Sequence, residues 1–171
     1  MYRAEDILDA RENRVFKEKK ILEKYLNTLI VVRANYPGIN KDNFITREIV
    51  SVVGNHILNI KDFKNKILFK EIEYTADGPI FFIVVNENFL NIKKICINIE
   101  ENHKLGRCVD IDVYNEKGKG ISRRNFGLPS RKCFLCSEDA HVCVRSRKHS
   151  EKDVIDYIEK TLEDYRENAY E

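Results

Sequence analysis

The chain has 171 residues, a length that suits one compact domain, and we expect a single domain over residues 1–171. Hydrophobic residues make up 43% of it, which is enough for a packed core and excludes a wholly disordered protein. Its 30 basic and 28 acidic residues nearly cancel, so the formal net charge of +2 argues against a general nucleic-acid binder.

The apolar segments argue against a membrane or secreted protein. The first twenty residues are charged throughout and contain no apolar segment of the signal-peptide kind. The longest apolar runs, at 28–32 and 80–85, have the length of strands and not of membrane-spanning helices. We therefore expect a cytoplasmic protein, in which five cysteines favour free thiols or a metal site over disulfides.

Apolar spacing predicts the first elements of the chain. An amphipathic helix is expected over 5–26, followed by a buried strand at 28–36 that ends in a Pro-Gly turn. A second helix, capped by Asp42 or Asn43, is expected to run to about residue 59.

The middle of the chain alternates between strands and one short helix. Strands at 67–74 and 79–85 flank an Asp-Gly dipeptide and are predicted to form a hairpin. A helix at about 87–94 then leads to a strand at 95–100. Strict alternation in VDIDVY predicts a further strand at 109–114.

Two short helices, at about 137–148 and 152–168, are expected to end the chain. The order strand, helix, hairpin, helix, strand is that of a ferredoxin-like split βαβ unit. We therefore predict an α+β fold, ferredoxin-like or nucleotidyltransferase-like. A mixed sheet would be flanked by helices, with an N-terminal helix and a helical C-terminal tail added.

The strand at 109–114 carries a pair of acids. Because strand side chains alternate, Asp110 and Asp112 point to the same side, with about 6–7 Å between their α-carbons. A divalent cation would relieve their repulsion, and Mg²⁺ accepts carboxylate and phosphate oxygens together. Gly106 and Arg107, just before the strand, favour a phosphate site. The alternative is that both aspartates lie on the solvated face of an edge strand.

A basic segment follows, in which seven Lys or Arg stand against two acids between Ser122 and His149. Clustered arginines are typical of a site for several phosphate groups. A solvated surface is one alternative, and an RNA-binding patch is disfavoured because no nucleic-acid module is recognisable. The basic residues are Arg123, Arg124, Arg131, Lys132, Arg145, Arg147 and Lys148.

Cys133, Cys136, Cys143 and His149 lie within the same segment. The first pair has zinc-knuckle spacing, and thiolates with an imidazole suit a structural Zn²⁺ ion. The last two are six residues apart near a predicted helix, which is not a helix-face repeat. Buried thiols that pack the tail are therefore the alternative.

Three segments, HKLGRCVDIDVY, GKGISRRNFGLPSRKCFLC and AHVCVRSRKH, together resemble the holo-citrate lyase synthase family, the apo-citrate lyase phosphoribosyl-dephospho-CoA transferases. The resemblance is dense from His103 to His149. It continues more weakly upstream through ILDARENRVF, TLIVVRANYPGINKD and TREIV.

The resemblance implies an enzyme, a nucleotidyltransferase. It would move the prosthetic group from 2'-(5''-triphosphoribosyl)-3'-dephospho-CoA to a serine of the citrate lyase acyl carrier protein subunit and release pyrophosphate. Two alternatives remain. One is a related transferase that acts on another acyl carrier protein, such as that of malonate decarboxylase. The other is a zinc-binding interaction module that docks an acidic partner.

The resemblance also implies roles for single residues. Asp110 and Asp112 would hold Mg²⁺ against the triphosphate, and His103 would bind phosphate or shuttle a proton. Arg11 and Arg33 match the weaker upstream resemblance without a role. Glu100, Glu101 and Asp77 are candidates for a third carboxylate. The candidate phosphate-binding residues are Gly106, Arg107, Arg123, Arg124, Arg131, Arg145 and Arg147.

Overall fold

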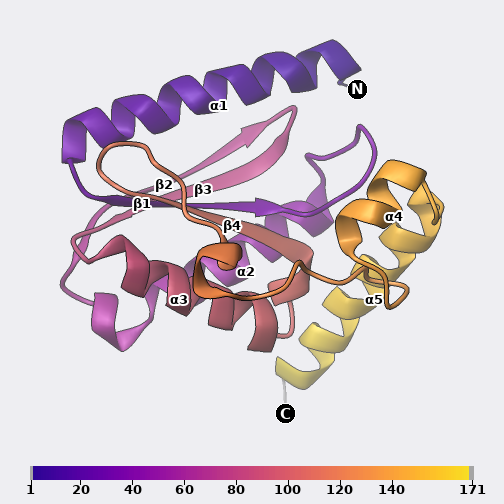
Figure 1. Cartoon of the computed structure of the whole chain (residues 1–171). Helices are drawn as coiled ribbons and strands as arrows, with labels where there is room; N and C mark the ends of the chain where they lie inside the picture. Colours follow the sequence, from indigo (N-terminus) through magenta and orange to yellow (C-terminus); the bar gives the residue numbers. More distant parts are fainter. Residues whose placement is uncertain (1, 170–171) are drawn as a thin grey trace.

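A computed structural model describes residues 2–169 of the chain. Four strands form one sheet in the order β2-β3-β1-β4, and every neighbouring pair is antiparallel. The central strands are therefore β1 and β3, and β4 is an edge strand (Figure 1). The strands are β1 (Thr28–Ala34), β2 (Ile67–Thr75), β3 (Gly78–Val85) and β4 (Val109–Tyr114).

Helices precede, interrupt and follow the strands. None of those described combines the length and the apolar composition needed to cross a membrane. The α-helices are α1 (Ala4–Tyr25), α2 (Phe44–Leu58), α3 (Phe89–Asn102), α4 (Ala140–Ser146) and α5 (Glu151–Ala169). Short 3₁₀ helices lie at Lys61–Phe63, Gly106–Cys108 and Arg123–Phe126.

The order β1-α2-β2-β3-α3-β4 is the ferredoxin-like arrangement, to which α1 and the α4–α5 tail are added. The predicted α+β class, N-terminal helix and helical tail are confirmed. The sheet differs from the prediction because it is antiparallel throughout the described residues and not mixed. Its strands are joined by one tight hairpin and by two helical crossings.

The predicted strand at 95–100 is wrong, because this stretch belongs to α3. Ile92, Cys96 and Ile99 are buried at helical spacing, and so are Lys93 and Glu100 on the adjoining positions. The six-residue segment ICINIE also fits a strand, because so short an apolar run does not distinguish the helical period of about 3.6 residues from the strand period of two. Asn88 caps the helix by accepting the Leu90 N–H at 2.9 Å.

The two faces of the sheet are covered unequally. Helices α2, α3 and α5 pack on one face over the main core, which contains Ile30, Val32 and Ile111. Helix α1 crosses the other face (Figure 1). There Ile21 and Leu22 of α1 bury a smaller cluster that contains Leu29, Val31, Ile80, Phe82 and Val84.

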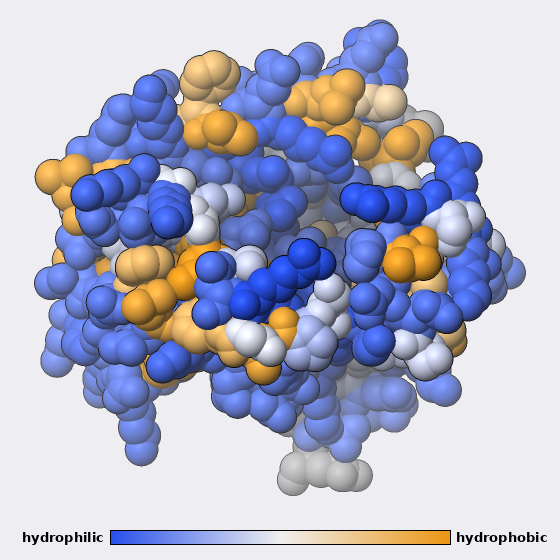
Figure 2. Space-filling model, in the orientation of Figure 1, coloured by the Kyte–Doolittle hydropathy of each residue, from blue (hydrophilic) through white to orange (hydrophobic). Residues whose placement is uncertain are grey.

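The rest of the α1-covered face is lined by the charged half of α1, the part that carries Arg11, Arg14 and Glu18. Arg11, Arg14 and Glu18 follow a helical spacing, and they point toward the sheet where apolar residues would otherwise lie. Figure 2 shows hydrophilic side chains around a hollow below α1. The α1 face thus has a dry apolar part and a charged part.

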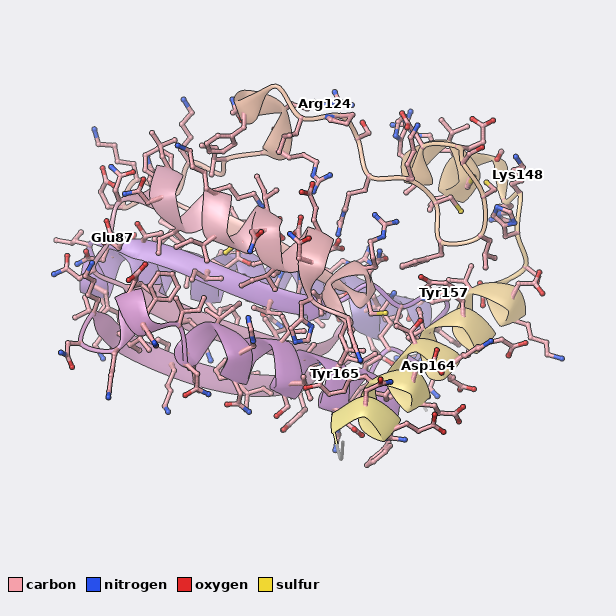
Figure 3. The ribbon with its side chains drawn as sticks, turned by 90° about the horizontal axis from the view of Figure 1, so that it is seen from below. Glu87, Arg124, Lys148, Tyr157, Asp164 and Tyr165 are labelled. Atoms are coloured by element: carbon pink, nitrogen blue, oxygen red, sulfur yellow. The ribbon has the colours of Figure 1, made fainter. Side chains whose placement is uncertain are left out.

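The helical tail returns to the main core through α5. Ile158 and Leu162 are buried there, and Arg166 donates to both oxygens of Glu48 on α2, at 2.8 and 2.5 Å. Figure 3 shows Tyr157 and Tyr165 on this helix. Tyr157 stacks against Phe134, with 5.1 Å between the ring centroids, so α5 also supports the segment before α4.

Candidate active site

Asp110 and Asp112 lie on the α1 face of edge strand β4. Val109, Ile111 and Val113 point the other way and are buried in the main core. The predicted strand and its alternation are therefore confirmed. The two carboxylates are partly exposed, at 30% and 43% of their side-chain areas, so solutes can reach them.

Each aspartate is paired with an arginine from a different part of the chain. Arg33 of β1 donates to Asp112 at 2.8 Å, and Arg131 donates to Asp110. Burial opposes the charged form of both arginines, but the aspartates, together with Glu100 in the case of Arg131, outweigh it and raise the pKa of each guanidinium. The repulsion between the carboxylates is thus relieved by protein cations as well as by any bound metal.

A second ion-pair group lies under α1, at the β2–β3 turn. The Asp77 carboxylate is only 3% exposed and accepts from Arg11 at 3.0 Å and from Arg14 at 2.6 Å. Arg14 also contacts Glu18 at 3.3 Å. Burial raises the pKa of Glu18, and the Asp112 charge adds to this effect while Arg14 and Arg33 oppose it. Asp77 is therefore occupied by arginines from α1.

Glu100 of α3 organises the outer edge of β4. Its buried carboxylate accepts the Ile111 N–H at 3.2 Å and lies 3.5 Å from Arg123 and 4.0 Å from Arg131. Arg131 also donates to the Val109 carbonyl at 2.9 Å. Arg131 is thereby fixed beside Asp110, and Arg123 is fixed beside Glu100.

The predicted metal ligands Cys133, Cys136, Cys143 and His149 converge outside this site. Their ligand atoms all lie within 4.8 Å of one another, with Cys136 Sγ 3.5 Å from Cys143 Sγ and 3.3 Å from His149 Nε2. Ligand atoms around tetrahedral Zn²⁺ lie about 3.3–3.8 Å apart, since Zn–S bonds are about 2.3 Å. The group could therefore hold a metal ion such as zinc.

The irregular spacing of this group has a local explanation. Helix α4 ends at Ser146, and Arg147 adopts a left-handed conformation with φ of 49°. The chain turns back there and brings His149 to Cys136. Burial disfavours the Cys133 thiolate, but the N–H groups of Leu135 and Cys136 and the nearby thiols lower its pKa overall.

The family model of the apo-citrate lyase phosphoribosyl-dephospho-CoA transferases matches residues 2–165. The chain belongs to this family. A transferase of that name from Citrobacter koseri is 31% identical over 160 residues, which cover 93% of this chain and 87% of the relative. A probable transferase from Vibrio cholerae is 31% identical over 94% of this chain and 92% of its own. Protein CitXG of Leuconostoc mesenteroides subsp. cremoris is 30% identical over 95% of this chain, which spans 35% of that longer protein.

The structure also places three of the candidate phosphate-binding residues, Gly106, Arg107 and Arg124. Gly106 is buried, and a Cβ there would lie 2.1 Å from the Ile99 carbonyl oxygen, so close packing on α3 requires glycine. Arg107 donates to the Lys132 carbonyl and lies over the Phe134 ring. Arg124 contacts the Ser130 hydroxyl at 3.2 Å.

His103 lies on the opposite side of the sheet from the aspartates. It follows α3, accepts the Leu105 N–H at 3.0 Å, and packs beside His56 of α2 and Tyr165 of α5. Burial, with the His56 charge, lowers the pKa of His103. Arg145 and Arg147 are exposed at the end of α4, so the basic segment is spread over the surface. In Figure 3 Arg124 and Lys148 lie on separate projections.

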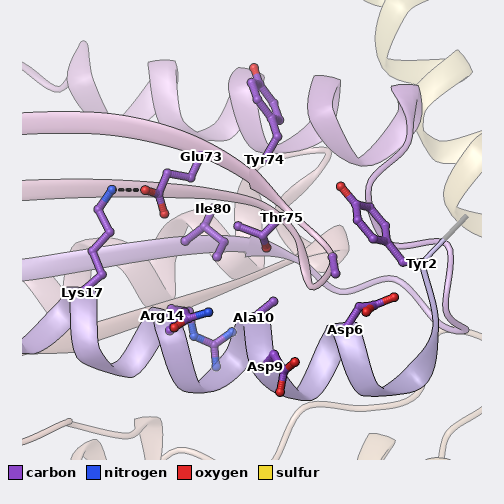
Figure 4. Close-up of a pocket in the computed structure, with 12 residues that line it drawn as sticks. Tyr2, Asp6, Asp9, Ala10, Arg14, Lys17, Glu73, Tyr74, Thr75 and Ile80 are labelled. Atoms are coloured by element: carbon purple, nitrogen blue, oxygen red, sulfur yellow. Dashed lines mark hydrogen bonds and ion pairs between the residues drawn. The ribbon is translucent and has the colours of Figure 1, made fainter.

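A groove of about 700 Å³ lies on the other side of α1, against the β2–β3 hairpin. Its acidic side chains disfavour a phosphate-rich ligand, and the Lys17–Glu73 ion pair crosses it (Figure 4). The lining of this groove therefore does not favour it as the site for such a ligand. The polar residues around the groove are Tyr2, Asp6, Asp9, Asn13, Arg14, Lys17, Glu73, Tyr74 and Thr75.

The sequence alone did not predict that Arg11 and Arg14 of α1 form ion pairs with Asp77. Arg11 and Arg14 lie three residues apart and Glu18 four further on, so a charged stripe on one helix face was the available signal. Asp77 was predicted in a hairpin turn and as a candidate third carboxylate, but not as the partner of two arginines of α1. Nothing local indicated Lys41, which lies near Asp77 in the structure.

Proposed function

We propose that this chain attaches the phosphoribosyl-dephospho-CoA group to apo-citrate lyase. The donor is 2'-(5''-triphosphoribosyl)-3'-dephospho-CoA, and the acceptor is a serine of the acyl carrier protein subunit. One observation carries the proposal: two same-facing carboxylates, Asp110 and Asp112, lie among fixed arginines in a member of this family. Relatives along nearly the whole chain carry the name of that activity.

The reaction requires control of negative charge. The serine oxygen bonds to the phosphorus next to the ribose, the serine proton leaves, and pyrophosphate departs with the electrons of the broken P–O bond. Such transfers depend mainly on positioning and on fixed positive charge around the phosphates. Arg33 and Arg131 supply that charge on β1 and beside β4, and Arg123 supplies it near Glu100.

The aspartate pair fits one Mg²⁺ ion that arrives with the donor. Each carboxylate contacts its arginine through one oxygen, which leaves the other oxygen for a cation. Within residues 2–169 no third acidic, histidine or cysteine side chain forms a ligand group with them. Mg²⁺ commonly takes one or two carboxylates, with waters and phosphates as its other ligands. Bound there, it would neutralise charge on the triphosphate.

The direct test uses mass spectrometry of the acceptor. Apo acyl carrier subunit of citrate lyase is incubated with this protein, the donor and Mg²⁺, and its intact mass is measured. A gain equal to the phosphoribosyl-dephospho-CoA group is expected. The acyl carrier protein of malonate decarboxylase, treated in the same way, should remain unmodified. No mass gain on the citrate lyase subunit would reject the proposal.

We further propose that the cysteine–histidine group binds one structural Zn²⁺ ion. Three thiolates and an imidazole form a closed tetrahedral set, with no position left for catalysis. Cys133 follows Arg131 by two residues, so the ion would hold the segment that carries Arg131 to Asp110. Its role in the reaction is therefore indirect.

Loss of zinc is expected to distinguish the structural role of Zn²⁺ from the role of Mg²⁺ in the reaction. Elemental analysis should find about one zinc per chain, and Cys136→Ser should reduce that content and lower the melting temperature. Transfer by the variant should fall because Arg131 is released, and added Mg²⁺ should not restore it. Cys96→Ser, which alters a buried cysteine of the main core, is the matched control and should keep its zinc. Full zinc content in Cys136→Ser would refute the assignment.

Docking of the acceptor is expected to depend on salt. Arg145, Arg147 and Lys148 are exposed around the end of α4, beside exposed Val144, and would complement an acidic acyl carrier subunit. The KM for the acceptor should rise with ionic strength while kcat changes little. Replacing both arginines by glutamine should flatten this dependence. A KM that is independent of salt in the unaltered protein would contradict the docking proposal.

A further inference from the structure

Lys41 is held firmly at the charged half of the α1 face. Its carbonyl accepts the Thr46 hydroxyl at 2.8 Å, and its Nζ donates to the Tyr36 carbonyl at 2.5 Å. The β2–β3 turn packs on it so closely that a Cβ at Gly78 would lie 2.8 Å from the Lys41 carbonyl oxygen. Both ends of the lysine are thus fixed, its backbone against the turn that carries Asp77 and its Nζ at the Tyr36 carbonyl.

The charge of Lys41 is poorly compensated. Burial lowers its pKa, and the charges of Arg11 and Arg33 lower it further, against the opposing effects of Asp77 and Asp110. Those two carboxylates are already engaged by arginines. Among the residues that the structure describes, none forms an ion pair with Lys41. Its ammonium group has three N–H donors, and the Tyr36 carbonyl uses one.

Arg33 presents a second open donor on the same face. Its Nη2 contacts Asp112, whereas its Nε is buried without a hydrogen-bond partner within the described part of the chain. Buried N–H groups nearly always have a partner, and an orphan of this kind points to an acceptor supplied by a ligand. Lys41 and Arg33 lie close enough for the Arg33 charge to lower the pKa of Lys41, so a ligand with several anionic oxygens would supply acceptors to both.

We propose that Lys41 and Arg33 form an oxyanion-binding subsite for the pyrophosphate portion of the donor's triphosphate. The inference rests on the proposed function and adds two residues to it. The subsite lies beside Asp112, so a phosphate chain bound there can also reach a cation on the aspartate pair. Arg145 and Arg147 are not needed for this step, since they are exposed at the end of α4.

Binding of inorganic pyrophosphate, measured by calorimetry with and without Mg²⁺, tests the subsite. The unaltered protein should bind it, and Lys41→Gln should weaken the affinity about tenfold or more, because one charged hydrogen bond is lost. Glutamine keeps an N–H donor for the Tyr36 carbonyl, and Lys41→Met, which removes the charge and the donor together, is the second variant. Lys41→Arg should retain most of the affinity. Lys20→Met, on the exposed part of α1, is the control.

Two results would overturn the subsite. One is the absence of pyrophosphate binding to the unaltered protein, and the other is unchanged affinity in a folded variant that lacks the Lys41 charge. Failure of the proposed function is recognised separately, by the absence of transfer to the acyl carrier subunit. In the transfer assay, Lys41→Gln should raise the KM for the donor and leave the KM for the acceptor unchanged.

Discussion

Replacement of either aspartate of the pair by asparagine should reduce transfer about a hundredfold or more, with the fold retained. Asparagine preserves the shape of Asp110 or Asp112 but removes the charge that a cation on the triphosphate would require. Because both side chains are partly exposed, the substitutions should change the unfolding free energy far less than they change the rate. The measurement is the initial rate of acceptor modification by mass spectrometry.

Magnesium dependence distinguishes two roles for the pair. If the carboxylates hold the ion, Asp112→Asn should need more Mg²⁺ for half-maximal rate than the unaltered protein. If they only orient Arg33 and Arg131, the Mg²⁺ requirement should not change. Asp62→Asn, at an exposed position of a 3₁₀ helix, is the matched control and should behave as the unaltered protein. Normal rates in both variants would remove the pair from the reaction.

Substitution of Glu100 should affect both stability and transfer. Glu100→Ala leaves the Ile111 N–H unpaired and takes the counter-charge from Arg123 and Arg131. Loss of a buried, hydrogen-bonded carboxylate is expected to lower the unfolding free energy by about 3 kcal/mol. Released from this contact, Arg131 should also hold Asp110 less well, so transfer should fall.

Glu100→Gln separates these two effects. The amide oxygen still accepts the Ile111 N–H, so we expect a smaller stability loss, of about 1–2 kcal/mol in urea unfolding. The negative charge is absent, so the fall in transfer should persist. Glu101→Gln is the control, because Glu101 is half-exposed and contacts only Arg123 of the two arginines. Full activity of Glu100→Gln would show that the carboxylate serves the fold alone.

Much of the fold follows from short-range patterns in the sequence. Alternation in VDIDVY predicted β4 and the shared face of Asp110 and Asp112, and the Asp-Gly signal predicted the β2–β3 hairpin. The strand prediction for 95–100 was wrong because the apolar residues there fit both the helical and the strand period. Cys96 and Ile99 pack in the main core from a helix.

The candidate site could be predicted only in part, for reasons of distance along the chain. Arg33 reaches Asp112 across 79 positions, and Arg131 reaches Asp110 across 21. Such contacts depend on the register of the strands and on the path of the loop, and residue spacing in the sequence does not predict them. The ligand set of Cys133, Cys136, Cys143 and His149 was predicted, but its closure depends on the left-handed turn at Arg147.

The outer edge of β4 has a consequence for how a protein acceptor is recognised. Four of its outward backbone groups are already used: Val109 O by Arg131, Ile111 N–H by Glu100, Ile111 O by Lys93 and Val113 O by the Ile121 N–H. An edge whose backbone groups are largely occupied is a poor template for an added strand from another chain, which also protects it from edge-to-edge aggregation. We therefore expect the acceptor to present its serine on a loop or helix and to be recognised through side chains.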